Sequence, residues 1–159
     1  MYVKTLLISL AFNFINEKPV TYVANLDEVV VTAKSIKKED VIFLAKIVHS
    51  EGSISKEDYL AIAHTVIVRM NYKKATIKEV CTKKQYNGLN TSKFHKNPPK
   101  EAIWAATQAL LGNSYNIYPH NLYYFHNYKT STNRTWVNHI RKYKWRDIGD
   151  HEFCLNNKM

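Results

Sequence analysis

The amino-acid sequence predicts an α+β fold in which helices come first and short strands follow. Apolar residues recur at helical spacing through residues 41–69, and signatures of helix starts occur at Ser55 and Thr76. Beyond Gly112 the sequence changes to aromatic, β-prone pieces that continue to residue 153. We expect one domain over residues 37–155, an N-terminal segment over residues 1–36 and a tail over residues 156–159.

The first three predicted helices each have a recognisable start. An acidic pair, Glu39 and Asp40, precedes the apolar positions of a helix that runs towards residue 51. Residues 55–58 (SKED) have the form of a capping box, which predicts a helix from about Lys56 to Arg69. Residues 76–79 (TIKE) repeat that signature and predict a short helix ending near residue 81.

The fourth helix is predicted from a proline pair and an alanine-rich run. Asn97 is the expected N-cap, the prolines that follow it suit a first turn, and Gly112 is the expected stop. Residues 121–126 (NLYYFH) then predict a strand in which Tyr123 and Tyr124 face opposite sides. One of these two tyrosines should therefore face the core and the other a groove.

Composition limits the partners and the chemistry. The chain of 159 residues carries a net charge of +10, which implies an anionic partner such as nucleic acid, a membrane surface or an acidic cell-wall polymer. Two cysteines, Cys81 and Cys154, are too few for a disulfide framework, and one bridge or two free thiols are both open. The seven histidines show no metal-binding spacing, so no metal site is expected from them.

The N-terminal segment supports two interpretations. Lys4 and the apolar run over residues 5–15 have the charge and length of a signal-peptide core, and the run is too short to span a bilayer as an ordinary helix. Residues 22–24 (YVA) make a poor cleavage site because Tyr22 is bulky where a small residue is needed. A weak export signal and a structured first element both remain open.

Glu51 is the candidate catalytic residue. It ends an apolar helical run beside Gly52, and no Asp or Glu occurs between Glu101 and Asp147, where half of the aromatic residues lie. A carboxyl at a helix end that faces aromatic rings suits general acid/base work if burial raises its pKa. The alternative is an ordinary solvated glutamate just past a helix.

With these elements placed, residues 41–154 resemble the SleB-like cell-wall hydrolases, the spore-cortex-lytic family that also occurs in phages and other bacteria. Four pieces carry the resemblance: residues 44–52 (LAKIVHSEG), residues 61–69 (AIAHTVIVR), residues 123–127 (YYFHN) followed by Trp136, and residues 148–153 (IGDHEF). The sequence departs from the family where Ala-Arg-Gly-Glu usually follows the glutamate. Residues 52–55 (GSIS) stand there instead, so a supporting acid is missing.

The resemblance implies a lysozyme-like catalytic domain acting as a lytic transglycosylase, with Glu51 as the single catalytic acid. The reaction that it implies needs neither a metal nor an organic cofactor. Glycan strands of peptidoglycan would be the partner, and the enzyme would act at the cell wall after export or phage delivery. A virion or envelope assembly partner is a further expectation, and nucleic acid is not expected. The residues expected to contact substrate are Gln85, Tyr86, Tyr124, Asn127, Trp136 and His151.

Each of these residues also has an ordinary structural interpretation. Gln85 and Asn127 can hydrogen-bond acetamido groups, but they can also form turns or caps. Trp136 can stack on a sugar or pack in the core. His151 can close the domain through a hydrogen bond.

Other functional classes also remain open. The chain could be a catalytically weak wall-binding or virion protein, a lysozyme-type hydrolase with a second carboxylate, or a nucleic-acid-binding module.

Overall fold

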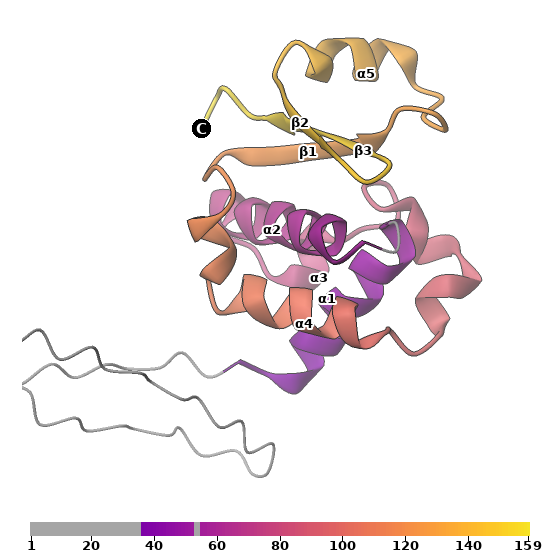
Figure 1. The fold of residues 1–159 in the computed structure, drawn as a ribbon, viewed down its shortest axis with the longest axis vertical. Coiled ribbons are helices and arrows are strands. Elements are labelled where there is room, and N and C mark those ends of the chain that lie inside the picture. Colours follow the sequence, from indigo (N-terminus) through magenta and orange to yellow (C-terminus); the bar gives the residue numbers. More distant parts are fainter. Residues whose placement is uncertain (1–35, 53–54) are drawn as a thin grey trace, which may run out of the picture. The chain divides into compact units, whose positions relative to one another are not determined.

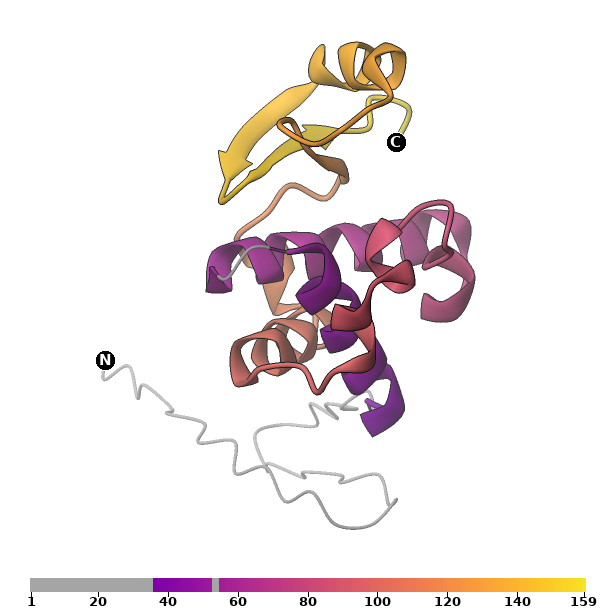
Figure 2. The same ribbon diagram turned by 90° about the vertical axis from the view of Figure 1, so that its right-hand side faces the viewer.

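In the computed structural model, helices α1 to α4 form one layer and a three-stranded sheet lies between α2 and the last helix, α5 (Figures 1 and 2). Residues 36–52 and 55–159 are described, so the predictions for the N-terminal segment lie outside the described residues. The α+β prediction is confirmed. The elements are α1 (Lys38–Glu51), α2 (Lys56–Lys73), α3 (Ile77–Val80), η1 (Asn87–Asn90), η2 (Ser92–His95), α4 (Lys100–Leu110), η3 (Asn113–Asn116), β1 (Leu122–Asn127), α5 (Arg134–Arg141), β2 (Lys144–Ile148) and β3 (His151–Leu155).

Two of the predicted helix starts are confirmed by their caps. The Ser55 side chain accepts a hydrogen bond from the backbone N–H of Asp58 at 3.0 Å, and α2 begins at the next residue. Thr76 and Glu79 form a reciprocal capping box at the start of α3. Each cap satisfies backbone N–H groups that have no partner within the helix.

The predicted start of the fourth helix is wrong by two residues. The N-cap of α4 is Pro99 rather than Asn97, and no side chain caps it. A residue that precedes proline is disfavoured from helical geometry, so Pro98 keeps Asn97 extended and Pro99 does the same to Pro98. At the other end α4 stops at Leu110, and Gly112 adopts the left-handed φ of 85° that suits a glycine stop.

Helix α2 is the centre of the fold. Every residue from Asp58 to Arg69 is buried, because α2 packs against α1 and α4 on one side and against β1 on the other. This buried stretch is rich in alanine, isoleucine and valine, whose burial stabilises the packing of the helix on both sides. The helix extends past the predicted end at Arg69 to Lys73, and the left-handed φ of 50° at Lys74 then ends it.

The sheet is antiparallel with the order β1–β3–β2, so the last strand in the sequence is the central one. Its register places Phe125 opposite Phe153 and Asn127 opposite His151. The predicted short strands of the C-terminal part are present, and α5, which the sequence analysis did not predict, interrupts them. Asn133 caps α5 by accepting a hydrogen bond from the backbone N–H of Trp136 at 3.1 Å.

The two cysteines are free and buried, which resolves the alternative between a bridge and two thiols. Burial raises the pKa of the Cys81 thiol to about 12 and that of Cys154 to about 11. Among the helices that the structure describes, none has the length and apolarity needed to cross a membrane.

Candidate active site

Glu51 is the last residue of α1 and points towards the loop that contains η1. Its Oε1 accepts a hydrogen bond from the backbone N–H of Gly88. A Cβ added at Gly88 would lie 2.8 Å from that same oxygen and would collide with the Ser50 side chain. A side chain at this position would therefore disturb the contact that holds the carboxyl.

The surroundings of Glu51 favour its protonated form. Burial raises the pKa of this carboxyl above its usual range. The hydrogen bond from Gly88 opposes that shift, as do the positive charges near it, but burial outweighs them. Glu51 therefore holds a proton at a pH where an exposed glutamate is ionised, which is what a general acid requires.

Glu51 opens onto a cleft of about 700 Å³. The cleft brings together the end of α1, one residue of α2, the loop around η1, strand β1, the segment that follows it, and parts of α5 and β3. Of the seven residues expected from the sequence, six line it: Glu51, Gln85, Tyr124, Asn127, Trp136 and His151. Residues separated by as many as 100 positions in the sequence thus meet around one carboxyl.

Tyr86 is not brought to the cleft surface. Its side chain is 0% exposed, and its hydroxyl accepts a hydrogen bond from Arg69 Nη1 at 2.7 Å. Tyr86 therefore packs beneath the cleft and cannot touch a bound glycan in this arrangement. Tyr123 and Tyr124 do not divide as predicted, since both line the cleft although Tyr123 is the more buried of the two.

The two amide residues already have partners within the protein. With the nitrogen of its amide facing the Val80 carbonyl, Gln85 accepts a hydrogen bond from Lys73 Nζ at 3.1 Å. The Asn127 Oδ1 accepts from the backbone N–H groups of Lys129 and Thr130 at 3.0 and 3.2 Å, so it caps the turn after β1. Asn127 thus combines the turn-forming role with a position in the cleft.

Trp136 provides an aromatic surface on the α5 side of the cleft. It is 37% exposed, and its ring meets those of Tyr124 and His126 edge to face at centroid distances of 6.3 and 6.0 Å. Neighbouring rings fix the indole while leaving part of it accessible. This geometry suits stacking on the face of a sugar.

His151 lines the cleft and also ties β3 to α2. Its Nδ1 lies 3.0 Å from Oδ1 of Asp58, and both residues are buried. The structural interpretation of His151 as a residue that closes the domain therefore agrees with the geometry.

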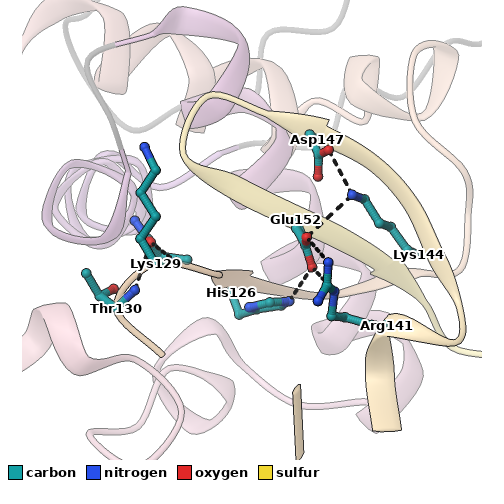
Figure 3. Close-up of polar contacts among 8 residues, drawn as sticks. His126, Lys129, Thr130, Arg141, Lys144, Asp147 and Glu152 are labelled. Carbon is teal, nitrogen blue, oxygen red and sulfur yellow. Dashed lines mark hydrogen bonds and ion pairs between the residues drawn. The ribbon is translucent and has the colours of Figure 1, made fainter. Parts of the chain in front are cut away.

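A polar cluster around the buried Glu152 contacts β1 through His126, and sequence reasoning missed it. Glu152 pairs with Arg141 at 2.8 Å, with His126 at 3.0 Å and with Lys144 at 3.4 Å (Figure 3). Burial lowers the pKa of His126, although Glu152 acts in the opposite direction. The cluster joins α5 to the sheet and so fixes the Trp136 side of the cleft.

Arg69 is a further cleft residue that the sequence analysis did not select. The available signal was a single cation at the end of an otherwise apolar and neutral run, residues 59–68. Among residues 36–52 and 55–159, no group of three or more His, Cys, Asp or Glu is placed to hold a metal ion.

Comparison with solved structures identifies the fold. The catalytic domain of the germination-specific lytic transglycosylase SleB from Bacillus anthracis superposes on this structure with a TM-score of 0.61 at 18% sequence identity. The match covers 75% of this chain and 96% of that domain. In this chain, the shared fold carries a cleft lined by the half-buried carboxylic acid of Glu51.

The sequence profile described as Cell Wall Hydrolase matches residues 54–154. The chain therefore belongs to the cell wall hydrolase family and is an enzyme that degrades peptidoglycan of the cell wall. No curated protein matches the chain. The matched residues begin after Glu51, so the role of this acid depends on the geometry described above.

Proposed function

We propose that this enzyme is a lytic transglycosylase that cleaves the bond between N-acetylmuramic acid and N-acetylglucosamine, with Glu51 as its single acid/base. The observation that carries the proposal is the composition of the cleft. Among the described residues that line it, Glu51 is the only carboxylic acid, and its pKa is raised by burial.

The acids near the cleft have other partners. The two buried acids are paired, Glu152 with Arg141 and Asp58 with His151. Three exposed acids are also paired: Asp147 with Lys144, Glu57 with Arg146 and Asp150 with Lys129. Ordinary glycoside hydrolysis uses two carboxyl groups that flank the scissile bond. The cleft presents one, which favours a mechanism in which the substrate supplies the nucleophile.

The reaction then runs in two linked proton transfers. Protonated Glu51 donates its proton to the glycosidic oxygen, and the bond from that oxygen to the muramyl C1 breaks. The Glu51 carboxylate accepts the proton of the muramyl C6 hydroxyl while O6 bonds to C1. The muramyl residue leaves as a 1,6-anhydro sugar, and Glu51 regains its proton without consuming water.

The product distinguishes this mechanism from hydrolysis. Digested sacculi analysed by mass spectrometry should contain muropeptides that end in anhydro-muramic acid and are lighter by one water than hydrolytic products. Reducing-end N-acetylmuramic acid as the sole product would contradict the proposal and indicate a lysozyme-type hydrolase. A protein that binds sacculi but releases neither product would be a wall-binding protein that has lost catalysis.

Family membership places the action of the enzyme at the cell wall. Delivery through an export signal remains a prediction because residues 1–35 lie outside the described part of the chain. A virion or envelope assembly partner likewise remains a prediction.

A further inference from the structure

Arg69 is a buried cation in the cleft with no carboxylate partner among the described residues. It is 7% exposed, its Nε donates to the Tyr123 carbonyl at 2.9 Å, and its Nη1 donates to the Tyr86 hydroxyl at 2.7 Å. In the described part of the chain, Nη2 donates to no protein acceptor and no ion pair includes Arg69. An uncompensated buried charge is costly, so it favours an anion wherever one can reach it.

The position of the guanidinium is fixed by its surroundings. Its central carbon lies 5.2 Å from the ring centroids of Tyr86 and Tyr123 and 5.8 Å from that of Phe125. Three rings and two hydrogen bonds hold it in one orientation. A guanidinium in a fixed, partly desolvated position binds a carboxylate better than a mobile surface side chain does.

When Glu51 is protonated, the described residues that line the cleft include no anion to balance its cations. Arg69 and Lys84 line it as cations, and Glu51 is its only acid in the described structure. Because the catalytic acid must be protonated, the cleft then contains two cations and no anion among its described lining residues.

We propose that Arg69 binds a carboxylate of the glycan substrate inside the catalytic cleft and thereby selects carboxylated strands over neutral ones. This inference rests on the proposed function. The carboxylate has two sources in peptidoglycan, the lactyl group of a muramic acid without its stem peptide and the acidic residues of the stem. The chemistry at Arg69 is the same for both.

A bound carboxylate would also assist Glu51. The positive charge of Arg69 lowers the pKa of Glu51 in the free enzyme, in opposition to burial. A substrate anion that neutralises Arg69 removes this effect, so Glu51 holds its proton more firmly once the substrate is bound. Binding of the substrate carboxylate and protonation of Glu51 are thereby coupled.

The test is equilibrium binding by calorimetry in a Glu51→Gln background, which mimics the protonated acid and prevents turnover. Two pairs of ligands are compared. The first pair consists of glycan strands freed of stem peptides by an amidase, with their carboxylates either free or coupled to methylamine. The second pair consists of strands that retain their stem peptides, again with free or coupled carboxylates. The wild-type Arg69 protein should bind carboxylated strands about 10- to 100-fold more tightly than their amidated forms, as expected for a charged hydrogen bond. The pair in which the preference appears identifies the lactyl or the stem carboxylate.

Variants of the two cleft cations show which of them causes the preference for carboxylated strands. Arg69→Met should abolish the preference, Arg69→Lys should keep part of it, and Lys84→Met, which removes the same charge from the same cleft, should retain it. Arg69→Gln, which keeps a donor for the Tyr123 carbonyl, serves if Arg69→Met fails to fold. Equal binding of carboxylated and amidated strands by the wild-type Arg69 protein, or an equal loss of preference in Lys84→Met, overturns the inference.

Failure of the proposed function can be distinguished from failure of this inference. If the enzyme with Glu51 intact releases no anhydro product, the proposed function fails, while the binding preference is still measured independently.

Discussion

The helical layer and the sheet are stabilised by different means. Most buried side chains of α1, α2 and α4 are apolar, among them Leu44, Ile47 and Ile62, each 0% exposed. The sheet also buries the charged Glu152, which pairs with buried His126 and with the partly exposed Arg141 and Lys144. Apolar packing holds the acid in place, and ionic contacts hold the opposite wall of the cleft.

This difference matches the roles that we propose for the two regions. A general acid needs a fixed, partly desolvated position, and the end of an apolar helix provides one for Glu51. The opposite wall needs polar and aromatic groups that meet a sugar, and such groups must be supported by partners when they are partly buried. The predictions below test this division, from the largest expected effect to the smallest.

Replacement of Glu51 with Gln should lower turnover of purified sacculi by about 10²–10⁴-fold, because it removes the proton of the general acid. The wild-type rate should fall as pH rises through the pKa of Glu51, which burial places above that of an ordinary glutamate. Thermal unfolding should show an intact fold, with no loss of melting temperature at neutral pH. More than about a tenth of wild-type activity would move the acid elsewhere.

Replacement of Glu152 with Gln should destabilise the protein by about 1.5–3 kcal/mol, because it weakens the hydrogen bonds of a buried carboxylate whose partners Arg141 and Lys144 are partly exposed. Denaturant unfolding measures the loss. The titration of His126, followed by NMR, should move to lower pH because Glu152 no longer opposes the effect of burial on its pKa.

The matched change in the helical layer is Leu44→Ala, which should cost about 2–5 kcal/mol through the cavity that it leaves. Because Leu44 belongs to the apolar core, the His126 titration should not move in this variant. A shift of that titration in Leu44→Ala would show that the two regions are not supported independently.

Trp136→Ala should raise KM on glycan strands by roughly fivefold to tenfold, in line with about 1 kcal/mol for aromatic stacking. Trp136→Phe should be milder because it keeps a ring. Tyr143→Ala is the control, since Tyr143 has the same 37% exposure but does not line the cleft. If Trp136→Ala lowers only the melting temperature, Trp136 is a packing residue and its binding role is lost.

The smallest effect concerns the two thiols. With the pKa of Cys81 at about 12 and that of Cys154 at about 11, both should remain unreactive towards a thiol reagent at pH 8 in the folded protein. Both should react after unfolding in denaturant. Rapid reaction of one thiol in the folded state would show that its region opens locally.

Much of the fold was predictable because its signals are local. The capping residues Ser55 and Thr76 interact within four residues of themselves, and the position of Glu51 follows from the apolar periodicity of one helix. The segment around β1 was recognisable from its run of aromatic residues. Trp136 was misjudged as part of a strand region because the cap and the apolar stripe of α5 are short.

The rest of the site depends on contacts between distant residues. Asp58 and His151 are 93 positions apart, and nothing local in either segment indicates that they pair. The burial of Tyr86 likewise follows from Arg69, which lies 17 positions away and on another element. Such pairings depend on how the elements pack against one another. The periodicity of a single segment carries no information about that packing.

The position of β3 has a consequence for when the cleft is completed. β1 and β2 each pair with β3 and not with each other, so neither has a strand to pair with until β3 is present. During synthesis the helical layer and its acid emerge well before residues 151–155, and local helical contacts form faster than distant strand pairings. The nascent chain thus carries Glu51 before β3 can bring His151 to the cleft.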